Sequence, residues 1–106
     1  MTTQKLLPAL VAAKTEHDVS QFVFEESHRI GLSYELQQLG YDMEAVAKWF
    51  DKTARDLYHR INEAKTEMKK EDILHSHSAY AEMAQITEEA AVRIREIKSG
   101  SSQARA

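Results

Sequence analysis

Apolar side chains recur at steps of three and four over much of the chain, which is the spacing of one face of an α-helix. The pattern is strongest over residues 43–70 and 78–98. Asp42 precedes the first stretch as a possible N-cap, and Gly100 lies just past the second as a stop signal. We therefore predict two long amphipathic helices, whose apolar faces include Val46, Phe50, Leu57 and Ile61 in the first and Met83, Ile86, Ala90 and Ile94 in the second.

The two patterns cannot belong to one straight helix. A helix from residue 43 to residue 98 would be about 84 Å long at 1.5 Å per residue, which is too long for a compact domain of this size. The segment 70–78 contains Asp72, Ser76 and Ser78, all of which are acceptable N-caps. We therefore place a turn within 70–78 and predict a long antiparallel helical hairpin.

Three glutamates repeat every seven residues on the second helix, opposite its apolar face. They are Glu82, Glu89 and Glu96. Because the polar side of an amphipathic helix normally contacts solvent, we expect all three carboxylates to face water.

The N-terminal part shows shorter and less regular patterns. An apolar run over 6–13 indicates a short amphipathic helix rather than a signal peptide, since the run is only eight residues long. Thr15 resembles the start of a second helix, and Gly31 and Gly40 bracket a short third piece. The sequence thus predicts an all-α fold, a small helical bundle in which two or three shorter N-terminal helices pack on the hairpin. Residues 1–98 would form a single domain and residues 99–106 a flexible polar tail.

Composition narrows the possible partners. The chain has no cysteine, which excludes disulfides and thiolate metal sites and suits a cytoplasmic location. The net charge is −3, with basic and acidic residues interleaved, so nucleic acid is not an expected partner. No apolar stretch approaches the ~20 residues that span a bilayer, so a membrane is not expected either.

One cluster of residues suggests metal chemistry. Glu25 and His28 have the helical Glu-x-x-His spacing of di-iron bundles, and Glu26 stands between them. The helical wheel turns Glu26 toward the apolar face, where Arg29 is a possible partner for a carboxylate that would otherwise be costly to bury. The alternative is that these residues form solvated charge pairs and hold no metal. A metal-binding bundle using Glu25, Glu26 and His28 is therefore our alternative function, although no cofactor is required by the sequence.

The stretch from His28 to Gly40, followed by an amphipathic helix, distantly resembles the histidine phosphotransfer domains. The members of that family are also helical bundles of about this size, with an exposed histidine on a helix. The resemblance implies phosphotransfer through His28. The family has a lysine three residues after the histidine and then a glycine, whereas this chain has Gly31 and Leu32 there.

No nucleophile motif, phosphate loop or dinucleotide fingerprint is present, so an enzymatic activity is not expected. Two aromatic residues, Phe24 and Trp49, lie off the main apolar faces of their helices. Large apolar side chains in such positions indicate either that a further helix packs over them or that they form a contact surface. We therefore predict a non-enzymatic protein–protein interaction module, such as an adaptor, inhibitor or minor subunit. Its partner would be another protein or a second copy, with Phe24 or Trp49 at the contact.

Overall fold

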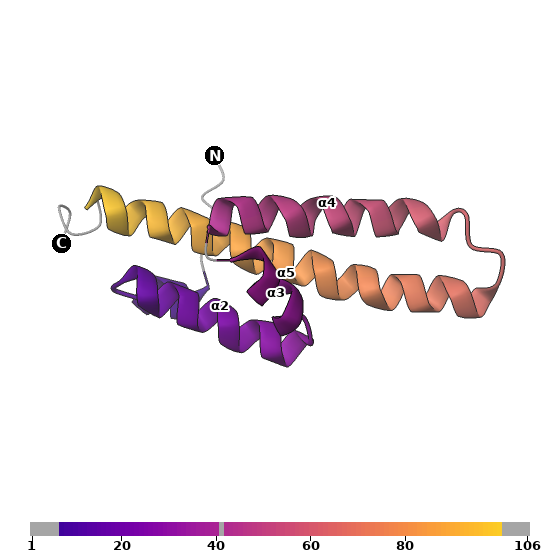
Figure 1. Ribbon diagram of the computed structural model, residues 1–106, viewed down its shortest axis with the longest axis horizontal. Coiled ribbons are helices and arrows are strands. Elements are labelled where there is room, and N and C mark those ends of the chain that lie inside the picture. The colour runs from indigo at the N-terminus through magenta and orange to yellow at the C-terminus, as the bar shows by residue number, and fades with distance from the viewer. Residues whose placement is uncertain (1–6, 41, 101–106) are drawn as a thin grey trace.

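The computed structural model describes residues 7–40 and 42–100, and these ranges hold five α-helices and no strand (Figure 1). The all-α fold and the antiparallel hairpin are confirmed. Three shorter helices precede the hairpin, as the sequence predicts. The helices are α1 Pro8–Ala12, α2 Glu16–Ile30, α3 Ser33–Leu39, α4 Met43–Ile61 and α5 Glu67–Ser99.

Short polar residues set the helix starts. The hydroxyl of Thr15 accepts a hydrogen bond from the backbone N–H of Asp18 at 3.1 Å, and the carboxylate of Asp42 accepts one from Ala45 at 3.3 Å. Each bond satisfies one of the free N–H groups in the first turn of a helix. α2 ends at Ile30 and is followed by Gly31, whose φ of +93° belongs to the left-handed region that favours glycine.

The predicted position of the turn between the long helices is wrong. α4 ends at Ile61, and α5 already begins at Glu67, so residues 70–78 are helical. The hydroxyl of Thr66 caps α5 by accepting from the N–H of Lys69 at 3.1 Å. Downstream of this cap, residues 67–78 contain no glycine or proline, and residues 67–71 are all glutamate, methionine or lysine, which favour a helix. α5 therefore runs for 33 residues, about 50 Å.

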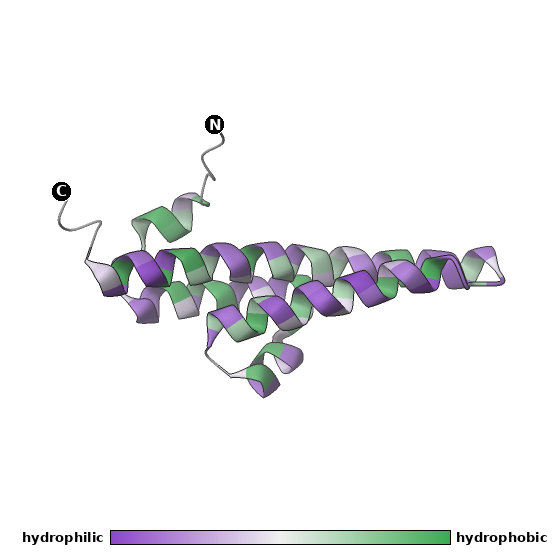
Figure 2. Cartoon of the chain, turned by 90° about the horizontal axis from the view of Figure 1, so that it is seen from above, coloured by the Kyte–Doolittle hydropathy of each residue, from purple (hydrophilic) through white to green (hydrophobic). Residues whose placement is uncertain are grey.

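α5 is the central element, and it packs against α4, α2 and α1 (Figure 1). Arg29 of α2 pairs with Glu82, and Glu16 pairs with Lys98, so α2 runs antiparallel to α5. α1, the short helix beside the N-terminal trace in Figure 2, lies on the opposite side of the bundle from α3. The buried core forms where these helices meet, and its members include Leu10, Val19, Val23, Leu36, Val46, Phe50, Met83, Ile86 and Ala90.

Glu89 does not face water, contrary to the heptad argument. Its side chain is almost completely covered, at 3% exposed, because α1 lies over this side of α5. The carboxylate accepts from the backbone N–H of Leu7 at 3.0 Å and from the side-chain amide of Gln85 at 2.9 Å. Glu82, one heptad earlier, is exposed as predicted.

The hairpin extends beyond the other helices, as the right-hand half of Figure 1 shows. The radius of gyration is 15.6 Å, compared with about 13 Å for a compact domain of this length. The burial of α5 shows where coverage ends. Its buried residues begin at Met83, and none of residues 67–82 is buried.

Most of the predicted tail, residues 101–106, lies outside the described residues. Ser99 is the last residue of α5, and Gly100 follows it in the left-handed conformation. Among the described residues, no helix combines the length and apolar character needed to cross a bilayer.

Candidate interaction surfaces

Phe24 forms one wall of a groove between α2, α3 and the start of α4. We call this the α2–α3 groove; its volume is about 350 Å³, and it is lined by Ser20, Phe24, Leu36, Gln37, Gly40 and Met43. The Phe24 ring is 38% exposed and packs edge-on against the His28 imidazole, with 4.4 Å between ring centroids. Phe24 thus presents an apolar surface to solvent beside a hollow. Its predicted contact with a partner stays a prediction.

Trp49 is exposed to the same extent, 38%, but belongs to an aromatic cluster. Its ring lies 5.2 Å from that of the buried Phe50 and 6.0 Å from that of Tyr80. One face of the indole is therefore used inside the bundle, and only the remainder is free to contact a partner.

Tyr80 links this cluster to α3. Its hydroxyl donates to a carboxylate oxygen of Glu35 at 3.3 Å. Burial, together with the charge and hydrogen bond of Glu35, raises the pKa of Tyr80 above its ordinary value of 10.0. Phe24, on α2, thus lies beside the α2–α3 groove, and Trp49, on α4, lies beside Tyr80. Both aromatic residues are therefore close to α3.

The residues of the metal hypothesis are each engaged locally. Glu25 accepts from the amide of Gln21 at 3.2 Å, and Glu26 pairs with Arg29 at 2.7 Å, the partner expected from the wheel. His28 is exposed, and its Nδ1 lies 3.1 Å from the carbonyl oxygen of Phe24. Within residues 7–40 and 42–100, no group of three or more histidine, aspartate or glutamate side chains is arranged to hold a metal ion.

The protruding end of the hairpin carries several exposed apolar side chains. Tyr58 is 57% exposed, Leu74 48% and Met68 76%. Leu57 and Ile73 beside them are only half-buried. We call these five residues the hairpin-tip patch. Sequence reasoning did not identify it because it placed a turn at residues 70–78, where Ile73 and Leu74 lie, and expected the apolar stripe of residues 43–70 to be buried.

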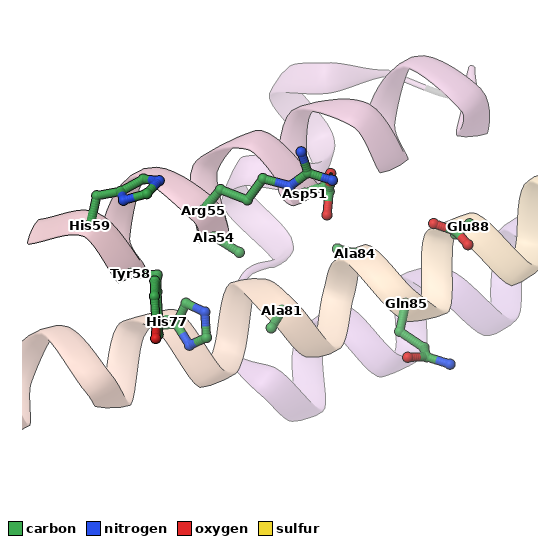
Figure 3. Close-up of a pocket in the computed structure, with 10 residues that line it drawn as sticks. All are labelled: Asp51, Ala54, Arg55, Tyr58, His59, His77, Ala81, Ala84, Gln85 and Glu88. Carbon is green, nitrogen blue, oxygen red and sulfur yellow. The ribbon is translucent and has the colours of Figure 1, made fainter. Parts of the chain in front are cut away.

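A shallow groove runs between α4 and α5 next to the hairpin-tip patch (Figure 3). Its volume is about 330 Å³, and small residues, Ala54, Ala81 and Ala84, form part of its lining. Tyr58 and His77 face each other across it, with 5.7 Å between ring centroids. An ion pair of 2.9 Å joins Asp51 to Arg55 along its edge. The groove combines polar and apolar groups.

None of the comparisons with known proteins identifies a relative: no family model, no curated protein and no solved structure matches this chain.

Proposed function

We propose that this chain is a protein–protein interaction module that self-associates through its hairpin. The observation that carries the proposal is the protruding end of α4 and α5, which keeps Tyr58, Leu74 and Met68 exposed. Large apolar side chains exposed on a protruding element favour a contact surface. Two such hairpins, related by a two-fold axis, would complete a local four-helix bundle.

The charge of the hairpin end is compatible with a second copy. Residues 55–78 contain equal numbers of basic and acidic side chains, so two copies would not repel each other electrostatically. The basic residues are Arg55, Arg60, Lys65, Lys69 and Lys70, and the acidic residues are Asp56, Glu63, Glu67, Glu71 and Asp72.

The size of the surface sets the expected affinity. The uncovered part of α5, residues 67–78, is about 18 Å long, and two adjacent helices are about 20 Å wide. The resulting area of about 400 Å² per copy is roughly half of the ~800 Å² per partner found in stable interfaces. Association through the hairpin-tip patch should therefore be reversible, with a dissociation constant on the order of micromolar to millimolar.

Sedimentation equilibrium from about 1 μM to about 2 mM would test the proposal, because this range spans the expected dissociation constants. We expect a monomer–dimer equilibrium that Leu74→Glu abolishes, since a charge would be buried without a partner. Val11→Glu is the matched control: Val11 is also an exposed apolar residue, at 59%, but lies on α1. A wild-type monomer at every concentration would overturn self-association, and equal association of Leu74→Glu would overturn the hairpin contact.

A further inference from the structure

The α2–α3 groove is part of a longer depression. A second hollow of about 400 Å³ adjoins it, lined by Glu16, His17, Ser20, Gln21 and Phe24. Ser20 and Phe24 line both hollows, so the Phe24 ring stands between them. Each hollow is near the lower end of the size range for ligand clefts. A pair of this kind suits two large side chains from one helix, spaced a turn apart, better than one small molecule.

The segment that builds this depression is strongly acidic. Residues 15–47, which lie between Lys14 and Lys48, contain seven aspartate or glutamate residues and a single arginine, a net charge of −6, or −4 with the two flanking lysines. The seven are Glu16, Asp18, Glu25, Glu26, Glu35, Asp42 and Glu44. The overall charge of −3 conceals this local excess.

Cations of the chain itself neutralise only part of the excess. Arg29 is shared by Glu26 and Glu82, so it compensates two acids with one charge. From α5, Arg95 pairs with Glu44 at 3.1 Å, and Lys98 lies 3.9 Å from Glu16. The other four acids have no lysine or arginine within ion-pair distance in the part of the chain that the structure describes; they are Asp18, Glu25, Glu35 and Asp42.

We infer that the α2–α3 groove binds a basic amphipathic helix of a partner protein. The apolar face of that helix would place two large side chains on either side of the Phe24 ring, against Leu36 and Met43 in the first hollow. Its lysines and arginines would lie over the acidic residues of α2 and the start of α4. Charge complementarity of this kind increases the association rate and selects the partner, while the apolar anchors supply most of the affinity.

The same charge argues against other occupants. Nucleic acids and anionic membranes present phosphates, which the acidic segment would repel. The hairpin of a second copy has no net charge over 55–78, so it lacks the basic excess that this groove selects. The inference is independent of the self-association proposed above, because it concerns different residues at the other end of the molecule.

A designed peptide tests the inference directly. The probe is a fluorescein-labelled helical peptide of about 16 residues, with leucines at i, i+3, i+4 and i+7 and lysines on the opposite face. Two further peptides serve as comparisons: one with every lysine replaced by glutamate, and one with the same composition but no amphipathic order. Fluorescence anisotropy should show at least about tenfold tighter binding of the ordered basic peptide than of either comparison, which corresponds to about 1.4 kcal/mol.

Matched variants on α3 locate the binding site. Gln37 lines the groove, whereas its neighbour Gln38 is also exposed but does not line it. Gln37→Lys should weaken binding of the basic peptide about tenfold, because the new charge lies in the groove, and Gln38→Lys should weaken it at most about twofold. Both variants change the net charge by the same amount, so a difference between them reports the position of the binding site. Phe24→Ser should weaken binding further, provided that circular dichroism shows an unchanged fold. Equal binding of the ordered and disordered basic peptides would overturn the inference, as would equal effects of the two lysine variants.

Discussion

Glu89 and Arg93 stand one turn apart on α5 and bind opposite ends of α1. The Glu89 carboxylate accepts from the N–H of Leu7 at the start of α1. The Arg93 guanidinium donates to the carbonyl of Ala13 at its end, at 2.7 and 3.2 Å from Nη2 and Nε. An acid at the N-terminus and a base at the C-terminus of a helix match its dipole and satisfy its free backbone groups. α1 has only five residues, so these bonds and the buried Leu10 explain how so short a helix is held.

Replacing Glu89 by alanine should therefore destabilise the fold by about 1–3 kcal/mol, because the backbone N–H of Leu7 would lose its partner in a covered site. Glu88→Ala is the control, since Glu88 is the next residue and is exposed. It should change the free energy of unfolding by less than about 0.5 kcal/mol. Urea denaturation measures both. Equal small effects would mean that α1 contributes little to stability.

Much of the fold could be predicted from the sequence because the long helices bury one continuous stripe. Their existence, the Thr15 and Asp42 caps and the hairpin follow from periodicity and cap chemistry. The turn could not be located in this way. Thr66 and the expected caps, Asp72, Ser76 and Ser78, differ in capping free energy by no more than about 1 kcal/mol. The packing of the two helices therefore decides which of them begins α5. Glu89 was misjudged because a helical wheel assumes one buried face, whereas α5 is covered by α4, α2 and α1.

The candidate surfaces were predictable to a lesser degree. Phe24 and Trp49 could be singled out because they lie off the apolar stripes, and both are partly exposed. Their surroundings depend on α3, whose seven residues are too few to show a clear pattern. The α2–α3 groove exists only because α3 folds back beside α2, which no local sequence rule specifies.

Truncation of apolar side chains along α4 should cost less free energy of unfolding the closer the residue lies to the tip of the hairpin. Phe50 is fully buried beneath Tyr80, so Phe50→Ala should cost about 3–5 kcal/mol. Leu57 is half-buried where α2 and α3 no longer cover the hairpin, and Leu57→Ala should cost about 1–2 kcal/mol. His59 is exposed, and its replacement should cost less than about 0.5 kcal/mol. Equal costs at positions 50 and 57, by equilibrium denaturation, would contradict an uncovered hairpin end.

Charged replacements should distinguish the two aromatic residues predicted to be partner contacts. Trp49→Glu should lower stability by roughly 2 kcal/mol, because the indole packs on Phe50 and Tyr80. Phe24→Asp should be tolerated better, since the ring borders an open groove. Neither change should alter self-association through the hairpin-tip patch. Thermal unfolding and sedimentation of both variants provide the measurement. A folded Trp49→Glu protein that no longer dimerises would place the contact at Trp49 instead.

Alkaline pH should weaken the fold through Tyr80. Its pKa is raised in the folded protein, first by burial and then by the Glu35 carboxylate, so folding favours the neutral phenol. A group of this kind contributes its full stability below the unfolded pKa of 10.0 and loses it as the pH rises through the higher folded value. The free energy of unfolding should therefore decline above about pH 10, and more steeply in the wild type than in Tyr80→Phe, which has no proton to lose. Glu35→Gln removes the repelling charge and should give an intermediate slope. Urea denaturation of the three proteins between about pH 8 and 11 measures the slopes, and identical slopes for wild type and Tyr80→Phe would show that the phenol titrates alike in both states.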